Sequence, residues 1–280
     1  MFNDYFEMEK TPFMNDIASD ALYMSPDLEE VLSRLKYAAE NQMFVIVTAD
    51  VGCGKSTTIR KFTDDLPNDD FEILYLSDSK LTPRWFYKGL LDQLGIESKF
   101  YRGDARHQLH QQLELIQGVY KKHVVTIVDE AHLLAKETLE EIRFLLNTKM
   151  DSQTPMSLIL VGQKELWDKL KLRNYAAIKQ RIDLICELQQ MDRAQTEEYI
   201  GAHLSYAKGV TDIFTDKAID EIFRFSVGSA RSINKLCTHA LLYAYQRAKR
   251  LIDDHMIRTV IQAEMPGGGK RWLHSNLSTP

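Results

Sequence analysis

A short segment in the first third of the chain has the residue types of a phosphate-binding loop. It reads Ala49-Asp50-Val51-Gly52-Cys53-Gly54-Lys55-Ser56, after an apolar run and before a helical pattern. Glycines let backbone N–H groups close around a phosphate, and the helix amino terminus adds its positive dipole. We expect Lys55 to bridge the β- and γ-phosphates of ATP and the Ser56 hydroxyl to ligate Mg²⁺. The predicted nucleotide-binding residues of the loop are Val51, Gly52, Cys53, Gly54, Lys55, Ser56 and Thr57.

The loop departs from the usual pattern at its first position, where Ala49 stands in place of glycine. Alanine does not adopt positive φ angles cheaply, but Gly52–Ser56 is intact, so we expect binding to survive. Cys53 lies inside the loop, where a helix amino terminus would acidify its thiol and permit a redox-sensitive switch. The simpler interpretation is a variable position that points away from the phosphates, and we favour it.

Two adjacent carboxylates, Asp129 and Glu130, directly follow the apolar run 124–128. Charges at the end of a buried strand are costly unless they hold an ion or polarise water. In proteins with a phosphate-binding loop the first acid orients Mg²⁺ and the second polarises the attacking water. We therefore assign Asp129 to the metal and Glu130 to catalysis. The pair favours ATPases with an additional strand between the two motif strands. We interpret His132 as a satisfied polar residue outside the chemistry.

Three more residues are catalytic candidates because of where they lie in the pattern. Gln163 follows the apolar run 156–161, and there it can orient the water as a sensor. Arg181, at a helix end, can reach a neighbouring subunit's ATP as an arginine finger, with Arg173 as the runner-up. Arg231 starts a later helix and can contact the nucleotide as that region closes. A polar strand end or a solvated arginine is the alternative for each.

The elements that must position these residues alternate along the chain. Runs rich in Val, Ile, Leu and Thr are typical of strands buried on both faces of a parallel sheet. Segments with helical periodicity separate them, which predicts a doubly wound α/β core with a five-stranded parallel sheet. The predicted strands are 43–48, 71–76, 123–128, 156–161 and 182–188, and the helices named between them are 81–94, 105–119 and 137–146.

The β pattern stops near residue 190, and four helical segments follow. They predict a small helical domain, in which Thr215 is an N-cap. The Pro-Gly-Gly-Gly sequence that starts at Pro266 predicts a flexible end. The helical segments are 194–207, 216–225, 231–250 and 253–263, and the predicted domains are a core with its N-terminal extension over 1–190, a helical lid domain over 191–264 and a tail over 265–280.

Charge is distributed unevenly in this chain of 280 residues with net charge −5. Residues 1–30 hold eight acidic residues against Lys10, and this pattern excludes a globally basic nucleic-acid-binding protein. The stretch 80–106 has six basic and three acidic residues, so a local basic stripe remains. The longest apolar runs are about five residues, far short of a membrane span of roughly 20 residues. No secretory leader is recognisable, and the three scattered cysteines form no metal or disulfide pattern. We expect a cytoplasmic protein.

The ordered set of motifs resembles the AAA+ ATPases, and more closely the ExeA/GspA-type family, over about residues 3 to 263. The chain differs from the family's usual residues at four positions, with Ala49 for Gly, Ser56 for Thr, His132 for Gln and Ala230 for Pro. The matching segments are Tyr5-Phe6, Pro12-Phe13, Val51–Ser56, Asp129–Leu134, Leu145–Asn147, Leu160–Leu166, Gln180–Ile182, Arg231–Cys237 and Ala240–Leu242.

The resemblance implies an αβα sandwich followed by a helical lid, with ATP and Mg²⁺ as cofactors. It implies that the stretch 1–30, with Tyr5-Phe6 and Pro12-Phe13, packs against the core near the nucleotide. Secretion members have a transmembrane helix and a peptidoglycan-binding domain, neither of which is recognisable here. We therefore expect a short form without a membrane partner, similar to the transposition regulators of the TnsC, MuB and TniB type.

Those regulators form rings or helical filaments on duplex DNA and engage a transposase and, in some systems, a target-selection protein. Our leading hypothesis is such an ATP-hydrolysing homo-oligomer that binds DNA without sequence specificity. One alternative is an ATPase for protein remodelling or secretion-complex assembly without DNA, and another is a nucleotide-gated scaffold. The candidate DNA contacts are Lys80, Thr82, Arg84, Arg102 and Arg106.

Overall fold

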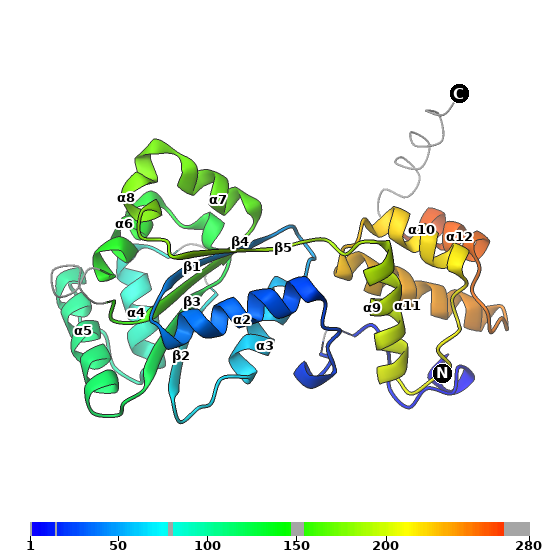
Figure 1. Ribbon diagram of the computed structural model, residues 1–280, viewed down its shortest axis with the longest axis horizontal. Helices are drawn as coiled ribbons and strands as arrows, with labels where there is room; N and C mark the ends of the chain where they lie inside the picture. Colours follow the sequence, from blue (N-terminus) through cyan, green and yellow to red (C-terminus); the bar gives the residue numbers. More distant parts are fainter. Residues whose placement is uncertain (1, 15, 78–80, 147–153, 266–280) are drawn as a thin grey trace. The chain divides into compact units, whose positions relative to one another are not determined.

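A computed structural model describes residues 2–14, 16–77, 81–146 and 154–265 of the chain (Figure 1). By their contacts the residues form two compact units. The first unit comprises the N-terminal residues up to Ser25, Gly52–Gly54 and the residues from Gln190 onward. The second comprises Pro26–Val51 and Lys55–Gln189. Residues 1–25 were expected to extend the core, but by their contacts they belong with the C-terminal helices.

The second unit is built on a parallel sheet in the order β2-β3-β4-β1-β5. The predicted five-stranded parallel sheet is confirmed, and β4 lies between β1 and β3 as the additional strand. The three central strands are almost wholly buried, which explains their continuous apolar sequences. The strands are β1 (Phe44–Ala49), β2 (Phe71–Leu76), β3 (His123–Val128), β4 (Ser157–Gly162) and β5 (Leu184–Leu188).

Helices cover both faces of this sheet (Figure 1). Helices α2 and α3 pack on one face, where α2 contacts β1, β3, β4 and β5. On the other face, alternate strand residues such as Ile46 and Leu160 join a core cluster with α4, α5, α6 and α7. The helices are α2 (Pro26–Glu40), α3 (Lys55–Asp64), α4 (Pro83–Gln93), α5 (Arg102–Gly118), η2 (Ala131–Leu133), α6 (Lys136–Leu145), α7 (Lys164–Lys171), η4 (Arg173–Tyr175) and α8 (Ala176–Lys179).

The described part of the first unit is helical and has its own apolar cluster. Side chains cap three of its helices: Asp192 in a capping box, Thr215 and Asp253. The Thr215 hydroxyl accepts from the Ala218 N–H at 3.2 Å, so this predicted N-cap is confirmed. The helices are α1 (Phe2–Tyr5), η1 (Ser19–Ala21), α9 (Arg193–Tyr206), α10 (Asp216–Ser226), α11 (Ala230–Gln246) and α12 (Asp254–Glu264).

The N-terminal segment packs inside this first unit. Phe6, Met8 and Phe13 are buried in the cluster formed with α9 to α12. The Phe13 N–H donates to Nδ1 of His203 at 3.1 Å, and the two rings stack with their centroids 5.2 Å apart. Burial lowers the pKa of His203 from 6.5 to about 4. The imidazole is therefore neutral at pH 7, as its role as hydrogen-bond acceptor requires.

Within the described residues, no helix has the length and apolar character needed to cross a membrane.

Protonation of His203 makes the stability of the fold dependent on pH. The unfolded chain takes up a proton as pH falls through 6.5, while the folded chain resists protonation until about 4. Stability is therefore present above pH 6.5 and is lost between 6.5 and 4, by about 2 kcal/mol from pH 7 to pH 5.

A His203→Gln variant lacks this titration. When the pH falls from 7 to 5, the wild type should therefore lose about 2 kcal/mol more of its free energy of unfolding than the variant loses. Urea unfolding at both pH values measures the difference. A gap between the two proteins that is the same at both pH values contradicts the assignment.

Candidate active site

Three groups of predicted site residues follow neighbouring strands, at the carboxyl edge of the sheet. The phosphate loop follows β1, Gln163 follows β4, and Asp129 with Glu130 follows β3. In the register Thr48 lies opposite Gly162, and Val128 lies opposite Leu160. Ligands of open α/β sheets bind beyond the carboxyl ends of the strands. The strand order therefore brings the three groups to one edge.

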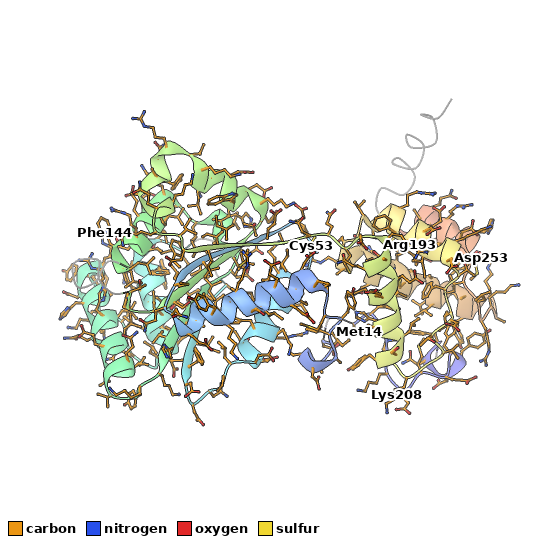
Figure 2. The ribbon with its side chains drawn as sticks, in the orientation of Figure 1. Met14, Cys53, Phe144, Arg193, Lys208 and Asp253 are labelled. Carbon is orange, nitrogen blue, oxygen red and sulfur yellow. The ribbon has the colours of Figure 1, made fainter. Side chains whose placement is uncertain are left out.

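The loop has the backbone that a phosphate cradle needs. Gly52 and Gly54 have φ angles of +85° and +86°, which glycine adopts without strain. Ala49 is the buried last residue of β1 and has no positive φ, so its replacement of glycine costs nothing in the backbone. Cys53 is half-buried in the loop between β1 and α3 (Figure 2).

Lys55, the first residue of α3, is held over the loop by backbone carbonyls. Its Nζ donates to the oxygens of Ala49 at 3.0 Å and Asp50 at 3.1 Å. Ser56 is exposed in the same first turn of α3. An ammonium group, an exposed hydroxyl and the backbone N–H groups of a helix amino terminus fit the phosphates and Mg²⁺ of a nucleotide.

Lys164 connects the loop with its neighbouring strands. Its Nζ lies 3.1 Å from Asp50 Oδ2 and 3.1 Å from Glu187 Oε1, and hydrogen bonds with these carboxylates raise the pKa of Lys164. Lys164 and Asp50 follow β4 and β1, Glu187 lies near the end of β5, and all three side chains are about 40% exposed. Such exposed pairs contribute little to stability.

Asp129 is firmly held at the end of β3, with 7% of its surface exposed. Its backbone N–H donates to the Leu76 carbonyl at 2.8 Å and so extends the ladder with β2. Its Oδ1 accepts from the Glu130 N–H at 2.8 Å, and its Oδ2 accepts from the Tyr75 hydroxyl at 2.8 Å. Burial, together with this hydrogen bond to Asp129, raises the pKa of Tyr75.

Glu130 adopts a left-handed backbone conformation with φ +50°. This conformation is uncommon for glutamate. It persists where the surrounding structure holds it, and such positions are often functional sites. The side chain of Glu130 is 42% exposed. It is therefore accessible to water, as a general base must be.

His132 links the catalytic candidate with the sensor candidate. Its Nε2 lies 3.2 Å from Nε2 of Gln163 and 3.6 Å from Oε2 of Glu130. Because an amide nitrogen only donates, His132 accepts this hydrogen bond through an unprotonated Nε2. The sequence analysis left His132 out of the chemistry, whereas the structure places it between Glu130 and Gln163. A histidine two residues after a catalytic acid was the available signal.

One of the arginine candidates lies at the opposite edge of the sheet. Arg181 precedes β5 at the amino edge of the sheet, where it lines an open pocket of about 540 Å³ with Phe44 and Arg143. The strands separate the two edges by about 17 Å, so Arg181 does not lie beside the loop of its own chain. Arg173 is exposed in η4, and Arg231 is exposed in the first turn of α11 in the first unit. Arg143 was not predicted.

The predicted DNA contacts lie in different surroundings. Lys80 lies outside the described residues, and the Thr82 hydroxyl caps α4 by accepting from the Trp85 N–H at 3.5 Å. Arg84 is exposed, and its guanidinium lies 4.2 Å from the centre of the Phe100 ring. Within the described part of the chain it is the charged candidate that pairs with no carboxylate.

Arg102 and Arg106 lie beside the carboxylate of Glu141, which is outside the stretch 80–106. They lie 3.4 Å and 3.8 Å from the oxygens of Glu141, which is 5% exposed and also accepts from the Tyr87 hydroxyl at 2.8 Å. A buried carboxylate needs such partners. The expected net charge of +3 is therefore partly balanced by α6, and these two arginines stabilise the fold of the second unit.

The described residues contain no group of three or more His, Cys, Asp or Glu side chains that could enclose a metal ion. Mg²⁺ is commonly held by one or two protein oxygens, with substrate phosphates and water as the other ligands. Ser56 and Asp129 are such oxygens, so this donor set fits Mg²⁺ bound together with a nucleotide.

Known proteins share this architecture. A family model described as an AAA domain matches residues 38–170. With a parallel sheet carrying the loop and the paired acids, this match decides the class. The chain therefore contains an AAA domain and has the AAA+ P-loop fold. General secretion pathway protein A of Aeromonas hydrophila is 31% identical over 260 residues, covering 90% of this chain and 46% of that protein. This identity supports the ExeA/GspA-type resemblance, and the chain spans about half the length of that relative.

Solved structures of other proteins have the same fold at low sequence identity. Cdc6p of Pyrobaculum aerophilum has a TM-score of 0.65 at 13% identity, over 89% of this chain and 69% of that chain. ORC1 of Aeropyrum pernix, solved in complex with DNA, has a TM-score of 0.64 at 11% identity, over 90% of this chain and 68% of that chain. At these identities the likeness establishes the fold alone.

The link through His132 predicts a graded effect on ATP hydrolysis. His132→Ala removes the group between Glu130 and Gln163, and we expect turnover to fall about tenfold with nucleotide affinity retained. His132→Gln keeps a hydrogen-bonding side chain and should retain most of the turnover. Phosphate release at saturating ATP measures both variants. Wild-type turnover in His132→Ala would exclude a role for this link.

Proposed function

We propose that the chain binds ATP with Mg²⁺ and hydrolyses it at the carboxyl edge of its sheet. The observation that carries the proposal is the arrangement of β3, β4 and β1 as neighbours, which brings the paired acids, Gln163 and the phosphate loop to one edge. An isolated glycine-rich turn or an isolated acidic pair is common. Their convergence on one edge is what phosphoryl transfer to water requires.

Each residue has a role that follows from its place. The loop N–H groups and Lys55 hold the phosphates, and Ser56 and Asp129 hold the metal. Bound Mg²⁺ neutralises charge that develops on the phosphate oxygens. Glu130 takes the proton from the attacking water, and Gln163 orients that water. Arg181, at the opposite edge, acts on a nucleotide bound by a second copy of the chain, which makes a homo-oligomer the working form. Arg231 acts as a nucleotide sensor from α11.

Substitutions in the loop and in the acidic pair should separate binding from hydrolysis. Lys55→Ala should abolish binding of a fluorescent ATP analogue, because the phosphates lose their cation. Glu130→Gln should retain binding and reduce phosphate release by about a hundredfold or more, because the general base is lost. Lys61→Ala, on the same helix but paired with Asp65, is the matched control and should change neither.

Glu130→Gln with wild-type phosphate release would falsify the catalytic assignment. Turnover retained in Glu130→Gln would indicate that another residue is the general base. Negligible ATP turnover in the wild type would favour the alternative of a nucleotide-gated scaffold.

We further propose that the client of this ATPase is duplex DNA and that the chain regulates transposition, as an ATP-dependent ring or filament that engages a transposase. Support comes from the resemblance to the short transposition regulators and from two cationic side chains on α4, exposed Arg84 and half-buried Lys88, which lie beside the aromatic rings of Phe100 and Trp85. AAA+ structures with DNA, such as Drosophila ORC bound to DNA, have this fold at low identity.

Arg84→Ala is a sharper test of DNA binding than Arg102→Ala, because loss of Arg102 also leaves buried Glu141 with fewer partners. With ATP analogue and Mg²⁺, Arg84→Ala should weaken binding of a labelled duplex several-fold and should lower the salt dependence of binding, with nucleotide affinity unchanged. Arg60→Ala, on α3, serves as a control for general charge loss.

A wild-type protein that does not bind duplex DNA, or binds it independently of salt, contradicts the DNA proposal. The second candidate is protein remodelling or secretion-complex assembly, which the 31% identity to general secretion pathway protein A favours. It predicts ATP hydrolysis that duplex DNA does not alter.

A further inference from the structure

Tyr75 makes a contact that the roles assigned above do not use. It lies near the end of β2, the edge strand next to β3, and its hydroxyl donates to Asp129 Oδ2 at 2.8 Å. The following residue, Leu76, accepts the Asp129 N–H at 2.8 Å. Two consecutive residues of β2 therefore fix the backbone and one carboxylate oxygen of Asp129. The other oxygen accepts the Glu130 N–H.

The backbone of Tyr75 is itself held by a side chain from another element. Gln93, the last residue of α4, accepts the Tyr75 N–H with Oε1 at 2.7 Å and donates Nε2 to the Tyr75 carbonyl at 2.7 Å. This amide pairs with both outward-facing groups of an edge strand, as a further strand would. An edge strand without a partner leaves such groups to solvent. Gln93 thus fixes residue 75 at the point where its hydroxyl meets the carboxylate.

A neutral donor suits a carboxylate that must attract a cation. The Tyr75 hydroxyl fixes the orientation of the Asp129 carboxylate and leaves its full negative charge. A lysine or arginine at the same place would fix it equally well but would compete with the metal by charge. Partners of this kind orient metal-binding groups before the metal arrives, and their loss typically weakens metal affinity.

We propose that Tyr75, held by Gln93, is a positioning residue for the Mg²⁺ site, which it serves by presetting the Asp129 carboxylate. The proposal rests on the proposed function, in which Asp129 holds the metal of Mg·ATP. It adds a residue of β2, outside the phosphate loop and the acidic pair, to the apparatus that binds the metal.

The chain offers a matched pair of tyrosines for the test. Tyr87 also donates its hydroxyl to a carboxylate at 2.8 Å, but its partner is Glu141, in the packing between α4 and α6. Tyr75→Phe and Tyr87→Phe each delete one oxygen and one tyrosine–carboxylate hydrogen bond. A purely structural effect should be larger for Tyr87, which is fully buried, than for Tyr75, which is 40% exposed.

The experiment is a Mg²⁺ titration of the binding of a methylanthraniloyl-ATP probe to the full chain. Tyr75→Phe should raise the half-saturating Mg²⁺ concentration about tenfold, with probe affinity in EDTA unchanged. Tyr87→Phe should leave the half-saturating concentration at the wild-type value while lowering the melting temperature. Gln93→Leu should shift the Mg²⁺ dependence in the same direction as Tyr75→Phe, by a smaller factor.

A Tyr75→Phe protein with the wild-type Mg²⁺ dependence overturns the inference and leaves the proposed function intact. A wild-type protein whose probe binding does not respond to Mg²⁺ overturns the proposed function and the inference with it. If Tyr75→Phe does not fold, as judged by circular dichroism, Gln93→Leu decides: a raised Mg²⁺ requirement supports the inference, and an unchanged one overturns it.

Discussion

A carboxylate at the end of a buried strand is the constraint on which the site depends. Asp129 keeps 7% of its surface exposed, so its charge has lost most of its hydration. Such a charge is tolerated when hydrogen bonds or an ion satisfy it. Here the Glu130 N–H and the Tyr75 hydroxyl supply the hydrogen bonds and the ladder to Leu76 fixes the backbone. Each of the two carboxylate oxygens keeps a further lone pair with which it can bind a metal ion or water.

The strand order turns this local arrangement into a site. Because β4 lies between β3 and β1, its end places Gln163 between the acids and the loop. His132 then bridges Gln163 and Glu130, and Lys164 bridges Asp50 and Glu187. Polar side chains therefore connect the ends of four adjacent strands. Burial of both sheet faces holds those ends rigidly, as a preorganised site requires.

Sequence patterns were sufficient for the sheet and for the main chemistry. The strands found at 71–76 and 123–128 have the predicted bounds, and the other three start or end within two residues of prediction. Helix α2 was not named, although Ser25-Pro26 and the apolar spacing of Val31 and Leu35 are signals of a helix start and a buried face. The placement of the loop, the acids and Gln163 at one edge follows from parallel strands alone.

Contacts between segments that are distant in the chain could not be predicted from the sequence. Tyr75 and Asp129 are 54 positions apart, and no spacing rule joins a tyrosine on one strand to an acid after the next. Glu141 lies outside the basic stretch whose charge it partly balances. Counting charges over 80–106 alone therefore gave too high a net positive charge for this surface. The buried aromatic residues of the N-terminal segment belong to the cluster of the C-terminal helices, which a pattern of local periodicity does not reveal.

The central claim is that Asp129 and the phosphate loop bind one metal–nucleotide complex. A crystal structure of the full chain with Mg²⁺ and a non-hydrolysable ATP analogue tests it most directly. The account predicts the terminal phosphates at Lys55, with the metal held by Ser56 and by Asp129, directly or through water. Nucleotide bound away from the carboxyl edge of the sheet, or a metal without contact to Asp129 or its bound water, would contradict the account.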